Sequence, residues 1–289
     1  MAVRLKPLLS LPLPPCHFNY SPRPFVYFSK KSQPTISAAK MATSGTDKTS
    51  PSPTKIIDSH LHVWASPQEA ADKYPYFPGQ EPTLPAHVDF LLECMKEAGV
   101  DGALIVQPIN HKFDHSLVTS VLEKYPTKFV GCCLANPAED GSGVKQFEDL
   151  VLKDGYRAVR FNPYLWPSGQ QMTNEVGKTI FSRAGELGVP VGFLCMKVYV
   201  KLSAFFRVSR MPFPYQDLSQ LLSQIVSSFG ANRVVWGSDF PYVVPECGYK
   251  GAKEAAAVLA NQVPLSSSEL ELIMGKTIMQ LFQGQWLQS

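Results

Sequence analysis

Short runs of β-branched residues alternate with amphipathic stretches along most of this chain, and that alternation restricts the available folds more than any other feature. Continuous runs of Val and Ile are typical of buried strands, whereas apolar residues spaced three and four apart are typical of helices. Strands that are separated by helices form a parallel sheet, since each helix carries the chain back to the same end of the sheet. The pattern therefore predicts an α/β fold with parallel strands from about residue 55 onwards.

The pattern contains seven predicted strands. They cover residues 56–63, 103–107, 129–135, 156–161, 189–195, 198–205 and 234–239. A helix is predicted after every strand except the fifth, and two helices are predicted after the last. A closed (β/α)8 barrel of the TIM type needs eight strands. The chain is therefore predicted to form an incomplete barrel of this type over residues 55–289.

The interruption lies near residues 197–198, where only two residues separate the fifth and sixth predicted strands. A parallel crossover needs about a dozen residues or more, so one strand and about two helices are predicted to be missing here. Since a βαβ unit takes roughly 30 residues or more, a gap of roughly 40 to 55 residues would account for the pattern. An exon-skipped splice isoform or a faulty gene model would produce such a gap. A genuine seven-strand barrel is the alternative.

Residues 1–54 differ in composition from the rest of the chain. Asp and Glu are absent before Asp47, while Ser and Pro are frequent. The basic residues of the stretch are Arg4, Lys6, Arg23, Lys30, Lys31 and Lys40. This composition is typical of organelle transit peptides, so residues 1–54 are predicted to be a disordered chloroplast transit peptide and linker. A mitochondrial address, an untargeted tail, and a cytoplasmic form that starts at Met41 are the alternatives.

The overall composition restricts the partners of the protein. Hydrophobic residues make up 45% of the 289 residues, charged residues make up 18%, and the formal net charge is +3. That charge is too small to indicate nucleic-acid binding, and no apolar run approaches the roughly 20 residues that cross a bilayer. The expected partner is a small-molecule substrate, with neither nucleic acid nor membrane, and the oligomeric state is left open.

Two histidines end the first predicted strand in the pattern Asp58-x-His60-x-His62. Because side chains alternate across a strand, all three residues are predicted to share one face. Two imidazoles on that face, at the mouth of a barrel, can coordinate one metal ion. A His-x-His pair is weak evidence alone, and its position at the end of the first strand of a barrel strengthens it.

The last predicted strand ends in Gly237-Ser238-Asp239-Phe240-Pro241. Barrel enzymes carry their catalytic groups in the loops that follow the strands. A carboxylate at Asp239 could bind a metal or accept a proton from an attacking water. The alternative is an aspartate that only caps the following turn.

Together the two motifs resemble the amidohydrolase-related family, whose members begin with His-x-His on the first strand and end with Gly-Ser-Asp-x-Pro on the eighth. The resemblance extends from about residue 56 to residue 283, apart from the predicted gap, with further matches at residues 155–162 and 200–203. It implies a barrel enzyme in which His60 and His62 are metal ligands. It also implies that Asp239 is the catalytic carboxylate that activates water and a third metal ligand.

The chain departs from the family pattern in its metal ligands. Metal-binding members also use a histidine on strand five and another on strand six, but here no histidine follows His115. Cys195 and Met196 stand near the expected place on strand five. The predicted cofactor is therefore at most one divalent, zinc-like cation, and a metal-free mechanism is the alternative.

The basic residues near the strand ends indicate an anionic substrate. A two-metal site would use a lysine or glutamate on strand four, where this chain has Arg157 and Arg160. Arginine can clamp a carboxylate through two hydrogen bonds, so Arg160 is predicted to bind substrate, and so is Lys201 in the barrel mouth. Structural ion pairs are the alternative for both. His111 and His115 are predicted to lie at a solvated helix terminus, and the alternative is that one of them lines the site.

The arginines and the absent strand-five histidine resemble the lactonase branch of the family, as in 2-pyrone-4,6-dicarboxylate lactonase, some members of which hydrolyse without a metal. The predicted function is hydrolysis of a lactone-type ring of a small carboxylated substrate by water attack. Two alternatives stay open. One is a metal-dependent decarboxylase of the aminocarboxymuconate semialdehyde type, and the other is a catalytically inactive truncated isoform.

Overall fold

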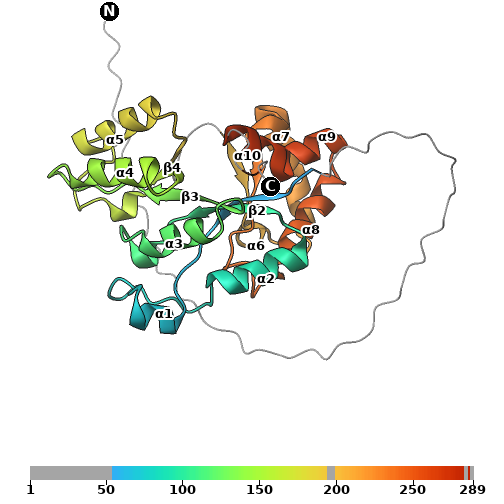
Figure 1. The fold of residues 1–289 in the computed structure, drawn as a ribbon. Coiled ribbons are helices and arrows are strands. Elements are labelled where there is room, and N and C mark those ends of the chain that lie inside the picture. Colours follow the sequence, from blue (N-terminus) through green and yellow to red (C-terminus); the bar gives the residue numbers. More distant parts are fainter. Residues whose placement is uncertain (1–53, 194–198, 283–285, 287–289) are drawn as a thin grey trace, which may run out of the picture. The chain divides into compact units, whose positions relative to one another are not determined.

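The computed structural model describes residues 54–193, 199–282 and 286, and in this part of the chain seven strands form two parallel sheets (Figure 1). The first sheet has five strands in sequence order, and the second pairs the remaining two. The strands are β1 Ile57–Leu61, β2 Gly102–Val106, β3 Phe129–Leu134, β4 Tyr156–Phe161, β5 Val191–Phe193, β6 Val200–Leu202 and β7 Val234–Trp236. The predicted parallel α/β architecture and the predicted number of strands are confirmed.

Helices connect and cover the strands. The α-helices are α1 Pro67–Asp72, α2 Val88–Ala98, α3 Ser116–Lys124, α4 Ser142–Leu152, α5 Glu175–Glu186, α6 Phe205–Val208, α7 Ser219–Phe229, α8 Gly248–Ala260, α9 Ser267–Glu271 and α10 Thr277–Leu281. The shorter helical turns are η1 Ile109–His111, η2 Pro163–Leu165, η3 Gln216–Leu218, η4 Ala231–Arg233 and η5 Leu272–Lys276. Helices α2 and α8, far apart in the sequence, pack side by side (Figure 1). No helix in the described ranges is long and apolar enough to cross a membrane.

The two faces of the strands pack against different partners. On β2, Leu104 and Val106 belong to an inner apolar cluster, whereas Ala103 and Ile105 belong to the larger cluster that includes the helices. Inward residues of the other strands complete the inner cluster, namely Ile57, Val130, Cys132, Ala158 and Val235. This arrangement is that of a barrel wall, with one face inside and the other under helices.

The C-terminal segment covers the end of the inner cluster at which the strands begin. Ile278, Phe282 and Trp286 belong to that cluster, and the indole Nε1 of Trp286 donates to the carbonyl of Lys128, just before β3, at 3.2 Å. A Cβ at Gly102, the first residue of β2, would lie 2.5 Å from the Trp286 ring. Glycine at position 102 therefore makes room for the tryptophan.

The barrel closes on one side and ends on the other. The loop after β7 binds the end of β1, with the amide of Asp239 donating to the His60 carbonyl at 3.1 Å and the amide of His62 donating to the Phe240 carbonyl at 3.0 Å. Between β5 and β6, by contrast, no strand pairing occurs among the described residues. The fold is thus an incomplete barrel, as predicted, and its two sheets end on either side of the predicted gap. The junction at residues 197–198 itself lies outside the described residues.

The sixth predicted strand is too long at its C-terminal end. The sequence predicted a strand over residues 198–205, but β6 ends at Leu202. Ala204 has a φ of 55° and precedes α6, which begins at Phe205. A left-handed residue cannot continue an extended strand, so the chain turns here and α6 carries its side chains to the mouth of the barrel.

An extra residue in β1 changes which side chains point inward. Ile57 and Asp58 pair with Gly102 and Ala103, but Leu61 pairs with Ile105, so one residue of β1 is unmatched. Such a β-bulge reverses the alternation of the strand that follows it. Ile57 therefore lies in the inner cluster, and Leu61 lies in the outer one.

The prediction that Asp58 shares a face with His60 and His62 is therefore wrong. Asp58 is fully buried on the helix side of β1. Its Oδ2 accepts a hydrogen bond from Tyr249 of α8 at 2.7 Å, and its Oδ1 accepts from the amides of His60 at 3.0 Å and Ser238 at 3.1 Å. Asp58 therefore joins β1, the loop after β7 and α8, and it holds the backbone that carries the histidines.

Replacing Tyr249 with Phe is expected to lower the free energy of unfolding by about 1.5–3 kcal/mol at pH 7, since a buried carboxylate loses one hydrogen bond. Burial raises the pKa of Asp58 to about 6, against the opposing effect of its hydrogen bonds. The loss should therefore be smaller at pH 5, where the carboxyl is neutral. Urea unfolding at both pH values measures this. Tyr164→Phe, at a side chain that is 84% exposed, is the matched control, and an equal loss in both variants would contradict the role given to Asp58.

Candidate functional site

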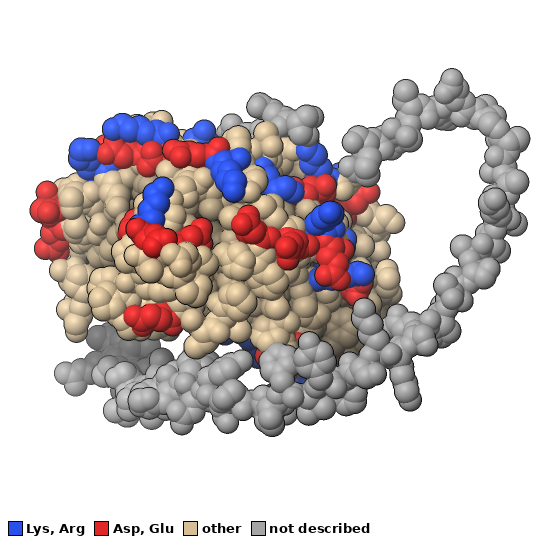
Figure 2. Space-filling view, turned by 60° about the horizontal axis from the view of Figure 1, so that its bottom comes forward, with Lys and Arg blue, Asp and Glu red and all other residues tan. Residues whose placement is uncertain are grey.

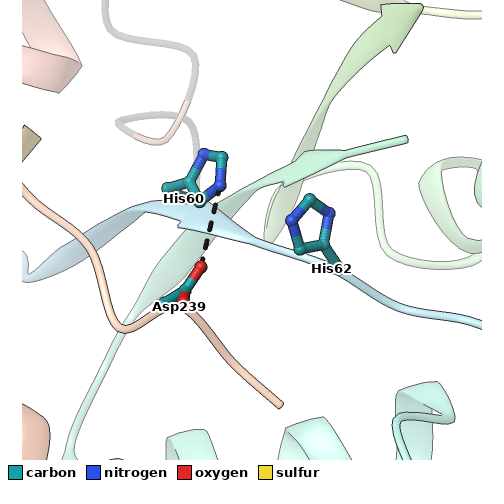
Figure 3. A group of neighbouring side chains, drawn as sticks. All are labelled: His60, His62 and Asp239. Atoms are coloured by element: carbon teal, nitrogen blue, oxygen red, sulfur yellow. Dashed lines mark ion pairs between the residues drawn. The ribbon is translucent and has the colours of Figure 1, made fainter. Parts of the chain in front are cut away.

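Three of the predicted site residues converge where β1 and β7 end (Figure 3). His60 is in β1, His62 follows β1, and Asp239 is in the loop after β7. One potential ligand atom from each of the three lies within 4.8 Å of the others. The His60 Nε2 is 3.9 Å from Oδ1 of Asp239. The two strand-end motifs, which are far apart in the sequence, thus meet in one cluster.

The hydrogen bond of His62 determines its tautomer. Its Nδ1 lies 2.8 Å from the carbonyl oxygen of Val106 at the end of β2. A carbonyl oxygen only accepts, so Nδ1 carries the proton and Nε2 keeps a free lone pair. Burial lowers the pKa of His62 to about 3, more strongly than this hydrogen bond raises it. His62 is therefore a neutral imidazole.

Lys201 contacts His60 directly. Its Nζ lies 2.9 Å from Nδ1 of His60. Burial, together with the nearby Arg160, lowers the pKa of Lys201 to about 8, which leaves most of it charged at pH 7. Burial has the largest effect on the pKa of His60 and the charge of Lys201 the next largest, and both lower it. That pKa lies well below its usual value, so His60 is neutral as well.

Asp239 is held in an unusual backbone conformation by its neighbours. Its φ is 61°, a left-handed value that few residues other than glycine, asparagine and aspartate adopt. The two hydrogen bonds to β1 keep the loop in place, and the amide of Tyr242 donates to the Asp239 carbonyl at 3.0 Å. The side chain is only 14% exposed. The backbone thus aims one carboxylate into the barrel mouth.

Cations surround this carboxylate. The Nε of Arg207, on α6, lies 3.3 Å from Oδ2 of Asp239. Burial raises the pKa of Asp239, and Arg207, Lys201 and Arg160 oppose that rise. On the face drawn in Figure 2, by contrast, acidic and basic side chains are mixed. The barrel mouth therefore has an excess of positive charge suited to anionic groups.

The predicted substrate-binding residues Arg160 and Lys201 both lie at this site, on β4 and β6, close enough to Asp239 to alter its pKa. Arg157 lies on the opposite face of β4, where it is exposed and donates to the Val151 carbonyl at 3.3 Å. Only one arginine of that strand therefore belongs to the site.

Sequence reasoning missed Arg207 and Tyr242. The guanidinium of Arg207 lies 4.9 Å from the centre of the Tyr242 ring, in a cation–π contact. Arg207 stands five residues after the end of β6, and barrel enzymes carry functional groups in loops of this kind. That position could have indicated Arg207. The strand predicted over residues 198–205, however, left almost no loop between its end and Arg207.

His111 and His115 are structural and lie outside the site. Both are buried, so the predicted solvated terminus is wrong for each. The Nε2 of His111 accepts from the Ala65 amide at 3.3 Å, and the Nε2 of His115 accepts from the Leu134 amide at 3.1 Å. Their Nδ1 atoms lie 3.2 and 2.9 Å from backbone carbonyl oxygens. Each ring therefore joins loops as a neutral donor and acceptor.

The cluster fits one divalent cation by distance but not by hydrogen bonding. Two histidines and one carboxylate are a common ligand set that leaves a place for water, and the free Nε2 of His62 and the carboxylate of Asp239 suit it. A charged Lys201 can only donate, so Nδ1 of His60 must accept and the His60 proton lies on Nε2. That nitrogen then has no lone pair for a metal, and the neighbouring cations repel one. Cys195 and Met196 lie outside the described residues.

Comparison with solved structures shows the same fold. A probable 2-pyrone-4,6-dicarboxylic acid hydrolase from Acinetobacter baumannii, with citric acid bound, matches with a TM-score of 0.63 at 16% identity, over 79% of this chain and 99% of its own. A putative enzyme of the same type from Pseudomonas putida matches with a TM-score of 0.63 at 21% identity, over 80% and 98%. The 2,6-dihydroxybenzoate decarboxylase from Rhizobium matches with a TM-score of 0.58 at 12% identity, over 80% and 99%. At these identities the likeness concerns the fold alone.

The sequence itself matches a family model. No curated protein matches the chain. The model described as amidohydrolase, by contrast, matches residues 57–197 and 195–283, in two pieces that meet at the predicted gap. These pieces contain both strand-end motifs and every residue of the cluster. The chain belongs to the amidohydrolase family.

Proposed function

We propose that the protein is a hydrolase that opens a lactone-type ring of a small carboxylated substrate by water attack. The observation that carries this proposal is the single carboxylate of Asp239, held among Arg160, Lys201 and Arg207 beside two neutral imidazoles. A carboxylate can serve as a base, and guanidinium and ammonium groups can bind the carboxylates of a substrate.

The reaction uses Asp239 twice. Its carboxylate takes a proton from a water molecule as the water oxygen bonds to the lactone carbonyl carbon. The negative charge that develops on the carbonyl oxygen is stabilised by the cations of the mouth. The ring C–O bond then breaks, and the leaving ring oxygen takes the proton back from Asp239. The product is one open-chain molecule with a new carboxyl and a new hydroxyl group.

The similar solved structures support this substrate class. Two of them are described as hydrolases of 2-pyrone-4,6-dicarboxylic acid, a cyclic ester with two carboxyl groups, and one holds citric acid. Both molecules are small polycarboxylates, which agrees with a mouth that contains three cations. Metal-free hydrolysis fits the hydrogen bond from Lys201 to His60 better than metal-assisted hydrolysis does.

A metal-dependent decarboxylation is the second candidate. It is favoured by the likeness to 2,6-dihydroxybenzoate decarboxylase and by the spacing of the three possible ligand atoms. It requires His60 to give up its hydrogen bond with Lys201. An inactive truncated isoform is the third candidate, since β5 and β6 do not pair among the described residues and a sheet edge is a structural liability.

A panel of cyclic esters tests the proposal. The full chain is expected to hydrolyse at least one carboxylated lactone, with 2-pyrone-4,6-dicarboxylate as the first compound, and to keep its activity after treatment with a chelator. Carbon dioxide release from a carboxylated aromatic acid, lost on chelation, would support the decarboxylase instead. If this chain is inactive, sequencing the transcript across residues 197–198 and testing any longer form separates an inactive isoform from a wrong substrate class.

Arg207→Met is expected to raise the KM for a carboxylated lactone by about tenfold or more, since a hydrogen bond to a charged group contributes about 1.5–3 kcal/mol. Methionine keeps most of the side-chain volume and removes the charge together with the N–H donors. Steady-state kinetics on the panel measure the effect. Arg183→Met, on the outer helix α5 where it pairs with Glu148 and Glu186, is the control, and an unchanged KM in Arg207→Met would exclude this arginine from substrate binding.

A further inference from the structure

Lys201 contacts His60, whose ring faces the carboxylate of Asp239 (Figure 3). The His60–Asp239 distance of 3.9 Å is too long for a direct hydrogen bond. The contact between Nζ of Lys201 and Nδ1 of His60, at 2.9 Å, is a hydrogen bond. The hydrogen bond with Lys201 of β6 therefore determines which ring nitrogen of His60 carries the proton. The other nitrogen, Nε2, faces Asp239.

The direction of that hydrogen bond follows from the chemistry of the groups. An ammonium has only donors, so Nδ1 must present its lone pair, and a neutral imidazole must then carry its proton on Nε2. His62, whose Nδ1 faces the carbonyl of Val106 at 2.8 Å, is forced into the opposite tautomer. Two adjacent histidines, with ring centres 5.0 Å apart, thus have different roles. His62 is an acceptor at Nε2, and His60 is a donor.

We propose that Lys201 is a positioning residue that fixes the tautomer of His60, so that this histidine presents an N–H toward Asp239 and does not bind a divalent cation. The N–H stabilises the ionised carboxylate and is available to an oxygen of the reacting water or ester. Only this catalytic consequence rests on the proposed function. The tautomer and the exclusion of a metal rest on the contacts and on the charge of the Lys201 ammonium.

Nitrogen NMR of the histidine rings tests the tautomer without any turnover. In the full-length, ¹⁵N-labelled protein at pH 7, long-range ¹H–¹⁵N spectra are expected to give the Nε2–H pattern for His60 and the Nδ1–H pattern for His62. The missing signals of His60→Gln and His62→Gln assign the two rings. In Lys201→Met the Nε2–H pattern of His60 should be lost, whereas Lys201→Arg should keep it. An Nδ1–H pattern for His60 in the unchanged protein would overturn the proposal.

Zinc binding gives the second test. By isothermal titration with zinc chloride, the unchanged protein is expected to bind at least tenfold more weakly than Lys201→Met. Adding His62→Ala to Lys201→Met should remove the gain, which places the ion at this cluster. Lys178→Met, which removes an exposed cation on α5, is the control. Equal affinities of the unchanged protein and Lys201→Met would overturn the exclusion of a metal. Neither test requires hydrolysis, so a wrong substrate class leaves both results intact.

Discussion

Asp239→Asn is expected to lower kcat on a hydrolysed lactone by about 10²–10⁴-fold, which is the usual contribution of a positioned general base. The amide cannot take the proton of the attacking water, although it has nearly the shape of the carboxylate. Asparagine also tolerates the left-handed φ of 61° at this position, so the loop after β7 should keep its conformation. Steady-state kinetics measure the loss, and circular dichroism checks the fold.

The control for this change is Asp149→Asn. Asp149 lies on the outer helix α4, where it pairs with Lys145 and Lys153, and its loss should leave kcat within about twofold because surface ion pairs contribute little. If Asp239→Asn kept full activity, Asp239 would not be the base. The catalytic carboxylate would then have to be sought elsewhere.

Acidification is expected to destabilise the protein steeply below about pH 6. Burial lowers the pKa of His115 to about 4 and of His62 to about 3, and it lowers the pKa of His60 and His111 as well. Their folded pKa values lie below the ordinary histidine value of 6.5, so the unfolded chain binds more protons as the pH falls. The stability they provide is therefore present above about pH 6.5 and lost below it.

Two carboxyl groups partly offset this loss. Burial raises the pKa of Asp58 to about 6 and also raises that of Asp239, so the folded protein takes up these protons first. More histidines have a lowered pKa than carboxyl groups have a raised one, and each proton of net difference changes the free energy of unfolding by about 1.4 kcal/mol per pH unit. Because domains have only about 5–15 kcal/mol of stability, urea midpoints should fall sharply between pH 6 and pH 4.5.

Single substitutions separate this effect from general destabilisation. His115→Asn should reduce the pH slope by about 1.4 kcal/mol per unit, since one proton is removed from the balance. Ile180→Val, on the buried face of α5, should lower the free energy of unfolding by about 0.5–1.5 kcal/mol equally at every pH. A slope that His115→Asn does not change would mean that this histidine is already charged in the folded protein.

The arrangement of the site could be predicted from the sequence only in part. His60 and Asp239 end the first and last strands, and in a closed barrel those two strands are neighbours, so their proximity followed from the alternating pattern. Asp58 was placed on the wrong face because a β-bulge depends on pairing with β2, which local alternation does not reveal. Arg207 was missed because the chain turns at Ala204, and nothing in an alanine indicates a left-handed conformation.

The sequence by itself determined the parallel α/β architecture, the incomplete barrel, the family, and the chemical groups at the two ends of the barrel sheet. These properties depend on local periodicity and on the order of strands, which a chain carries in its residues. Only the tertiary structure decided which nitrogen of each histidine carries a proton, since the tautomers of His60 and His62 follow from Lys201 and from the carbonyl of Val106. Those partners lie 141 and 44 residues away in the chain, and folding alone brings them within hydrogen-bond distance.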